Sequence, residues 1–97
     1  MSIGVIMEVV APAEKADALA QLLKDIIPDT RAYAGCEDIR VLRNSSKPEE
    51  FVIVEQWKER AAYDAYLAWR KQTGLPERMG AVLAAPPRVR FFEVTPY

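Results

Sequence analysis

Residues 51–57 read FVIVEQW, and this stretch decides the fold of the chain. Successive side chains of a strand point to opposite faces of a sheet, so alternate residues share a face. Phe51, Ile53 and Trp57 lie on one face together with Glu55, and the intervening valines lie on the other. A strand that is apolar on both faces is buried on both sides. We therefore expect residues 51–57 to form an inner strand with other elements packed against each face.

Three further segments have the alternation and the β-branched residues that are typical of strands. Residues 3–10 read IGVIMEVV, residues 37–43 read EDIRVLR, and residues 88–95 read RVRFFEVT. The first and last of these segments carry apolar side chains on both faces. The sequence therefore predicts a sheet with two apolar faces.

Two stretches between the predicted strands have the apolar spacing of a helix. In the first stretch, the positions i, i+3, i+4 and i+7 are held by Leu19, Leu22, Leu23 and Ile26. Pro12 suits the first turn of this helix. Pro28 lacks an N–H and is predicted to end or kink it, and a short further turn follows that Gly35 closes.

Residues 59–72 predict a second long helix. Its apolar stripe comprises Ala62, Tyr63, Ala65, Tyr66, Leu67 and Trp69. Gly74 is expected to end this helix, and Pro76 to start a short third helix that runs to about Leu83.

The order βαββαβ predicts an α+β domain of the ferredoxin-like, split βαβ type, with a four-stranded antiparallel sheet and helices on one face. We expect residues 1–97 to form one such domain. Two long helices cover only one face of the sheet, and an apolar face of that size is normally hidden. A second copy packed sheet to sheet would hide it, which predicts a homodimer through the sheet face. The alternative is that the third helix and the C-terminal segment cover this face.

Composition limits the function. The 97 residues have a net charge of −1 and contain one cysteine and no histidine. No basic patch suggests a nucleic acid or membrane partner, and Cys36 has no partner for an internal disulfide. The absence of histidine argues against His-ligated metal or haem and against His-based catalysis. The N-terminal residues lack the features of a signal peptide and no segment is long enough to span a bilayer, so we expect a cytoplasmic protein.

Three segments together give a resemblance to a known family: residues 30–36, which include Thr30-Arg31 and Gly35-Cys36, the strand 51–57 with Glu55-Gln56-Trp57, and the helix 61–67, AAYDAYL. The chain resembles the antibiotic biosynthesis monooxygenase (ABM) domain family of the dimeric α+β barrel superfamily. The resemblance implies a ferredoxin-like dimer with a pocket between sheet and helices in each protomer. Some members oxidise phenols or quinols with O₂ and no cofactor, others degrade haem, and others have no known activity.

One position departs from the pattern of the family. Many relatives have a histidine where Tyr66 stands, and the haem-degrading members use a histidine of this helix as an iron ligand. Haem degradation is therefore the activity that we expect least. The resemblance implies a cofactor-independent monooxygenase that oxidises a small or polycyclic phenol or quinol. The alternatives are a non-catalytic dimeric module that binds a small aromatic molecule, and an isomerase or lyase on the same fold.

Aromatic side chains are the predicted catalytic residues. Trp57 could stack on an aromatic substrate and donate its indole N–H to a substrate oxygen, or it could be a core tryptophan. Tyr63 and Tyr66 could each donate a proton to a developing oxyanion, or could simply pack as part of an amphipathic helix.

Charged side chains are the predicted substrate-binding residues. A buried Glu55 would have a raised pKa and could act as a base. The alternative is a salt bridge, on neighbouring strands or across the dimer, with one of four arginines: Arg40, Arg43, Arg88 or Arg90. Arg31 and Arg78 could stabilise an anionic oxygen, or could be solvated on the surface. Cys36 is expected to be an inert buried thiol, because no histidine can activate it. No metal ligand set is predicted.

Overall fold

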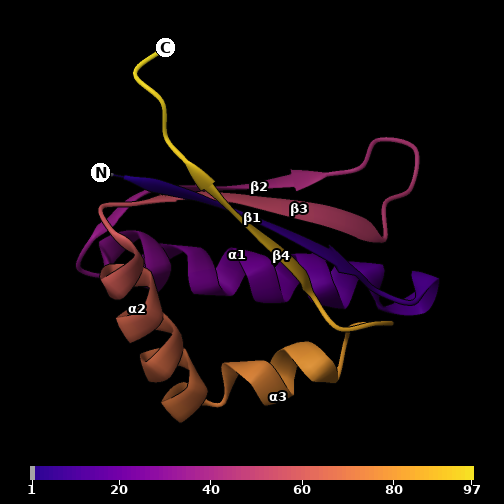
Figure 1. Ribbon diagram of the computed structural model, residues 1–97. Helices are drawn as coiled ribbons and strands as arrows, with labels where there is room; N and C mark the ends of the chain where they lie inside the picture. The colour runs from indigo at the N-terminus through magenta and orange to yellow at the C-terminus, as the bar shows by residue number, and fades with distance from the viewer. Residues whose placement is uncertain (1) are drawn as a thin grey trace.

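A computed structural model describes residues 2–97 of the protein (Figure 1). Its elements in chain order are β1 (Ile3–Val10), the 3-10 helix η1 (Ala13–Lys15), α1 (Ala16–Ala32), β2 (Cys36–Arg43), β3 (Glu50–Trp57), α2 (Arg60–Thr73), α3 (Leu75–Gly80) and β4 (Arg88–Glu93). The strands form one four-stranded sheet in the order β2-β3-β1-β4, and each neighbouring pair is antiparallel. The predicted ferredoxin-like α+β fold is confirmed.

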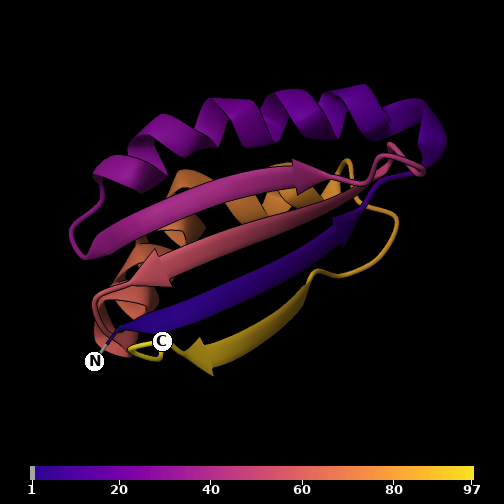
Figure 2. The ribbon, with the colours of Figure 1, turned by 90° about the horizontal axis from the view of Figure 1, so that it is seen from above.

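All three α-helices lie on the same side of the sheet, as Figures 1 and 2 show from two directions. The register of the sheet places Val5 of β1 between Glu55 of β3 and Phe91 of β4 on that side. Val5 and Trp57 are fully buried beneath the helices. β3 is an inner strand, as predicted, and its burial alternates strictly along its length. The helix-covered side of β1 and β3 is therefore the sheet half of the core.

Helix α1 continues through Pro28 to Ala32, so of the two predicted effects of Pro28, an end or a kink, the end with a separate turn after it is wrong. Proline removes the N–H that would donate to the Lys24 carbonyl, and the turn that follows is held by bonds from two side chains. The Thr30 hydroxyl donates to the Ile26 carbonyl over 2.9 Å, and the Arg70 Nη2 donates to the same carbonyl over 2.9 Å. These two side chains hold the last turn of α1 against α2.

Helix α2 differs in part from the predicted stripe. Its buried residues are Tyr63, Tyr66 and Arg70, whereas Ala65 is exposed and Leu67 is 41% exposed. The helix begins against the sheet and leads away from it (Figure 1), so only a narrow line of side chains faces inward. Gly74 ends α2 in the left-handed conformation, as predicted, with φ 80°.

Gly35 joins α1 to β2 at a place where a side chain would not fit. Its φ is 90°, and a Cβ atom there would lie 2.4 Å from the Cβ of Ala62. The close approach lets the N-terminal end of α2 pack on this loop. Lys58 N–H also donates to the Gly35 carbonyl over 2.8 Å. This junction fixes where α2 leaves the sheet.

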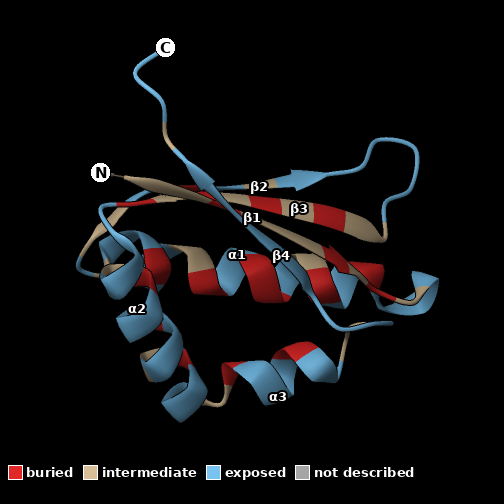
Figure 3. Ribbon diagram, in the orientation of Figure 1, coloured by how far each residue is buried: buried red, intermediate tan, exposed pale blue. Residues whose placement is uncertain are grey.

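The other side of the sheet, which we name the open face, carries Ile6, Leu42, Val52, Val54 and Phe92. Leu42 is 55% exposed and Phe92 is 47% exposed. Helix α3 lies on the opposite side of the sheet (Figure 1), so it does not cover the open face. Figure 3 shows β4 exposed along its length. The open face is thus an apolar surface that no helix of residues 2–97 covers.

None of the helices in residues 2–97 has the length and apolar character needed to cross a membrane.

Candidate functional site

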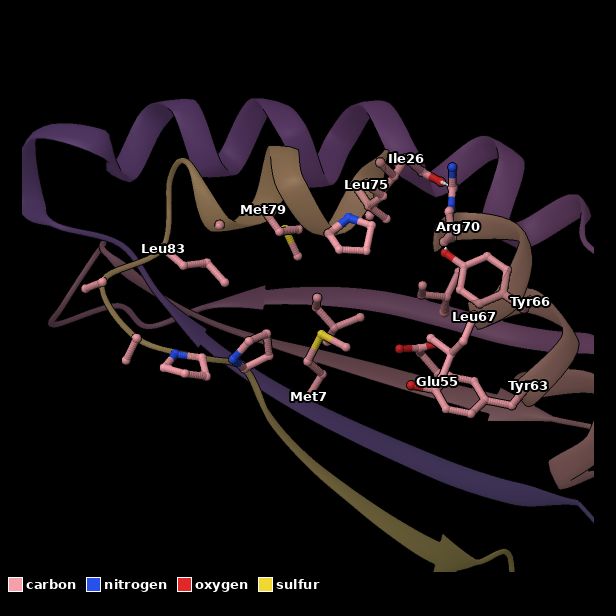
Figure 4. A pocket seen from close by; sticks show the side chains of 18 residues that line it. Met7, Ile26, Glu55, Tyr63, Tyr66, Leu67, Arg70, Leu75, Met79 and Leu83 are labelled. Atoms are coloured by element: carbon pink, nitrogen blue, oxygen red, sulfur yellow. Dashed lines mark hydrogen bonds between the residues drawn. The ribbon is translucent and has the colours of Figure 1, made fainter. Parts of the chain in front are cut away.

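A cavity of about 540 Å³ lies between the helices and the covered side of the sheet. Its size falls within the range of small-molecule sites, which is roughly 300–1,000 Å³. The wall comes from β1, β2, β3, all three α-helices and the segment 83–87 that leads to β4. Four polar side chains contribute to the wall, namely Glu55, Tyr63, Tyr66 and Arg70. Figure 4 shows all four gathered at one end of the cavity.

Glu55 is a carboxyl group in an apolar setting at this end. Its residue is 6% exposed, and its Oε1 accepts a hydrogen bond from the Trp57 indole N–H over 2.9 Å. Burial raises the pKa of the Glu55 carboxyl above its usual range, and the Trp57 hydrogen bond partly offsets the rise. Figure 4 shows the carboxyl pointing into the cavity. The Glu55 carboxyl group therefore takes on a negative charge less readily than an exposed glutamate does.

The alternative predicted for Glu55, a salt bridge with an arginine of a neighbouring strand, is wrong within one copy of residues 2–97, and a salt bridge across a dimer stays a prediction. Arg40 pairs with Asp38, and Arg88 and Arg90 both face Glu8 on the open face. Arg43 lies on the covered side but pairs with Asp17 at 3.2 Å, at the far end of β2. The strand alternation turns three of these arginines away from Glu55, which explains why it lacks a cationic partner.

Tyr63 lies beside Glu55, and its hydroxyl also points into the cavity (Figure 4). Its ring packs edge-on against Trp57 and against Phe91, with centroids 5.6 Å apart in each pair. Burial and the nearby Glu55 charge raise the pKa of the Tyr63 hydroxyl. No residue in 2–97 forms a hydrogen bond with this hydroxyl. Tyr63 is thus a neutral phenol whose proton is available to a ligand.

The Tyr66 hydroxyl, in contrast, is already engaged. It lies 2.6 Å from the Thr30 hydroxyl, and the Arg70 Nε donates to it over 2.9 Å. The single proton of Thr30 goes to the Ile26 carbonyl, so Tyr66 must be the donor to Thr30. The Tyr66 proton is therefore committed to Thr30, and Tyr66 offers the cavity mainly its ring.

Arg70 was not predicted from the sequence, although it stands four residues after Tyr66 and seven after Tyr63. Its residue is 7% exposed, and its Nη2 donates to the Ile26 carbonyl and to the Thr30 hydroxyl, each over 2.9 Å. The guanidinium lies 4.5 Å from the centroid of the Trp69 ring. No carboxylate of residues 2–97 pairs with it. The polar end of the cavity therefore carries an uncompensated positive charge.

Trp57 is placed behind the cavity wall, not in it. The residue is 0% exposed, and its ring lies among Tyr33, Tyr63 and Tyr66. Its indole N–H is used by Glu55. Trp57 can therefore act on a ligand only through the carboxyl that it holds.

The remaining candidates lie outside the cavity wall. Arg31 donates from Nη2 to the Ile39 carbonyl over 3.1 Å, and Arg78 is exposed on α3. Cys36 is half-buried, and burial raises the pKa of its thiol. In the part of the chain that the structure describes, no three acidic or cysteine side chains cluster as a metal site.

Comparisons with known proteins agree with this fold. The family model described as "Antibiotic biosynthesis monooxygenase" matches residues 2–72. A protein from Deinococcus radiodurans proposed to be an antibiotic biosynthesis monooxygenase is 28% identical and has a TM-score of 0.87, with 100% of this chain and 95% of that chain covered. Rv0793 from Mycobacterium tuberculosis is 25% identical with a TM-score of 0.79, with 100% and 98% covered.

A further solved structure, described as an antibiotic biosynthesis monooxygenase with no organism stated, is 24% identical and has a TM-score of 0.86, with 97% of this chain and 99% of that chain covered. No curated protein matches the sequence significantly. The family model spans well over half of the chain, including β1, α1, β2, β3 and most of α2. The chain therefore belongs to the antibiotic biosynthesis monooxygenase family.

Proposed function

We propose that the protein is a cofactor-independent monooxygenase that oxidises a phenol or quinol with O₂. The observation that carries the proposal is the pairing, at one end of a 540 Å³ cavity, of a carboxyl with a raised pKa and a phenol with a free proton. Membership of a monooxygenase family supports the reaction type.

Glu55 has the properties of a general base for this reaction. A hydroxyl of the substrate that reaches the polar end of the cavity can give its proton to the Glu55 carboxylate. The raised pKa brings the carboxyl closer to the pKa of a phenol or quinol, which improves proton transfer. Arg70 lies in the same wall, and its positive charge can favour the phenolate only at longer range, because its donors are held by Ile26, Thr30 and Tyr66.

Tyr63 has the properties of a hydrogen-bond donor to a second oxygen. Its hydroxyl keeps its proton, because burial raises its pKa, and points into the cavity beside Glu55. It can donate to the carbonyl oxygen that develops as the ring is oxidised. Glu55 and Tyr63 then have different roles. Glu55 accepts the proton of the substrate hydroxyl, and Tyr63 donates a hydrogen bond to the oxygen that becomes a carbonyl.

The electrons for the reaction come from the substrate. The phenolate passes one electron to O₂, and the resulting phenoxyl radical and superoxide combine to form a carbon–oxygen bond. The peroxide then breaks at its O–O bond as the ring C–H proton is lost, and the departing oxygen takes up that proton and the one held by Glu55 to form water. The overall change converts a phenol and O₂ to a quinone and one water, and both oxygen atoms of O₂ are accounted for.

A dimer through the open face is part of this proposal. The open face is apolar at its centre and carries Glu8 between Arg88 and Arg90, each 3.9 Å away. One Glu8 carboxylate oxygen is buried without a hydrogen bond in residues 2–97. A second copy packed on this face would cover Phe92 and Leu42 and leave the cavity on the outer side of each protomer.

The second candidate function is a binding module without catalysis. It is favoured by the hydrogen bonds among Tyr66, Thr30 and Arg70, because these side chains already have partners within the wall. Only Glu55 and Tyr63 are then left to react with a ligand. The two functions differ in oxygen consumption. An oxygen electrode with a panel of naphthols, anthrones and hydroquinones should show uptake above the protein-free rate for at least one compound. Saturable binding with no uptake on any compound would favour the binding module and contradict the oxygenase.

A further inference from the structure

The cavity is polar at one end only. Apart from the four polar residues, the wall consists of apolar side chains and one glycine, Gly80. Figure 4 shows Glu55, Tyr63, Tyr66 and Arg70 together at one end, and Leu83 at the other. The two ends therefore offer a ligand opposite environments.

The backbone at the apolar end also has little to offer a polar group. Segment 84–87 reads Ala-Ala-Pro-Pro and lines the cavity. The two prolines have no N–H, and the Ala84 N–H donates to the Val10 carbonyl over 2.8 Å. The Leu83 N–H is likewise used by the Met79 carbonyl at 3.0 Å. Residues 84–87 are exposed at the rim of the cavity, and a charged group that leaves water to lie among Leu83, Met7 and Met79 would gain few donors in return.

Two methionines line the cavity between its ends. Met7 of β1 and Met79 of α3 lie on opposite walls in Figure 4. Methionine is unbranched and polarizable, so it adjusts to apolar ligands of different shape. The volume of about 540 Å³ corresponds to roughly 18 water molecules at about 30 Å³ each. A single small ring at Glu55 would leave much of that volume unfilled.

We infer that the ligand is a single-headed amphiphile, with its hydroxyl-bearing ring at Glu55 and Tyr63 and an aliphatic or fused-ring body that passes Met7 and Met79 to reach Leu83. This inference rests on the proposed function in one respect, since it takes the head to be the phenol or quinol that Glu55 deprotonates. It adds the orientation of the substrate and the chemistry of its far end. We expect a ligand with a charged group at its far end to bind more weakly, because the wall there offers that group few donors.

The experiment is calorimetric titration of the full chain, without O₂, with methyl-, butyl- and hexylhydroquinone and with a hydroquinone whose six-carbon chain ends in a carboxylate. Each added methylene that enters the apolar end should tighten binding by about three- to fourfold, from roughly 0.8 kcal/mol per buried CH₂. The carboxylate-ended compound should bind no better than methylhydroquinone. Equal affinity across the alkyl series, or tighter binding of the carboxylate-ended compound, would overturn the inference.

A pair of variants tests whether the alkyl chain of the ligand binds at the Leu83 end of the cavity. Leu83→Asp places a charge at the apolar end and should weaken hexylhydroquinone binding at least tenfold while leaving methylhydroquinone binding within twofold. Ala81→Asp introduces the same charge at an exposed residue of the same segment, outside the cavity wall, and should change neither affinity. Equal weakening of both ligands in Leu83→Asp, with the fold intact by circular dichroism, would also contradict the inference.

The same titrations separate this inference from the proposed function. Chain-length dependence without oxygen uptake in air would retain the amphiphile site and reject the oxygenase. Oxygen uptake with methylhydroquinone but no chain-length dependence would retain the oxygenase and reject the amphiphile.

Discussion

The indole N–H of Trp57 donates to Oε1 of Glu55 over 2.9 Å, two residues apart on the same face of β3. A fully buried tryptophan thus holds the one carboxyl of the cavity wall. The pair places a carboxyl group in the apolar cavity of a chain that has no histidine. Burial makes the charge of Glu55 costly, and the tryptophan hydrogen bond keeps the carboxyl oriented toward the ligand.

Trp57→Phe should raise the pKa of Glu55 further. The hydrogen bond from Trp57 stabilises the carboxylate and opposes the effect of burial, so its removal leaves burial unopposed. The measurement is the chemical shift of the Glu55 carboxyl carbon against pH in ¹³C-labelled protein. Trp69→Phe is the matched control, because Trp69 makes no hydrogen bond to Glu55, and it should leave the titration in place. A midpoint that moves down in Trp57→Phe would contradict this role.

Glu55→Gln should raise the free energy of unfolding above that of the parent chain at neutral pH, and should not raise it at acid pH. The folded-state pKa of Glu55 is raised above its ordinary value of 4.5, so the folded state holds this proton more tightly than the unfolded state. Stability from this group is therefore greatest below about pH 4.5 and is lost as pH rises through the folded pKa. Each pKa unit of the shift corresponds to about 1.4 kcal/mol. Urea unfolding at pH 4 and pH 7.5 measures the difference between variant and parent.

Glu37→Gln is the control for that experiment and should show the opposite trend. Hydrogen bonds from Ser2 and Gln56 lower the pKa of the Glu37 carboxyl. Its contribution is present at neutral pH and is lost as pH falls through its folded pKa. A Glu55→Gln variant that is less stable than the parent at pH 7.5 would contradict the account of Glu55.

Thr30→Val should destabilise the fold by about 1–3 kcal/mol, because it leaves the buried Tyr66 hydroxyl without an acceptor. Valine has nearly the same shape as threonine, so packing is little changed. The same substitution at exposed Thr95 should cost less than about 0.5 kcal/mol. Chemical denaturation of both variants measures the two costs. Equal costs would show that the Thr30–Tyr66–Arg70 bonds contribute little.

The open face should hold two copies of the chain together. Light scattering at micromolar concentration should give a mass of about twice 10.9 kDa. Phe92→Asp places a charge on the open face, on the edge strand β4, and should reduce the mass to that of one chain. Tyr97→Asp, at a fully exposed aromatic residue off the sheet, should leave the dimer intact. A single-chain mass for the unaltered protein would reject the dimer.

The fold could be predicted from residues 51–57 outward. The alternation in the strands and the leucine spacing of α1 both indicate which side chains face the core. The residue at which α1 ends could not be predicted in the same way. Proline removes one local hydrogen bond, whereas the bonds that hold the turn after it come from Thr30 and, across 40 residues of sequence, from Arg70. A local pattern does not reveal a partner at that distance.

The candidate site was predicted in part. Glu55, Tyr63 and Tyr66 do line the cavity, since they face the covered side of the sheet. Arg70 escaped prediction because a charged residue on a helix is usually solvated, and only its seven-residue spacing from Tyr63 pointed inward. The difference between Tyr63 and Tyr66 was also hidden, because it depends on which hydroxyl Thr30 reaches.

The measurement that tests the central claim most directly is the rate of oxygen uptake by the unaltered chain and by Glu55→Gln, with the best substrate of the hydroquinone and naphthol panel. If Glu55 is the base, uptake by the unaltered chain should rise with pH to a plateau. The glutamine variant should lose about 10²- to 10⁴-fold of the rate, the usual contribution of a general base, while Glu37→Gln keeps it. A glutamine variant that retains the parent rate within twofold would contradict the claim.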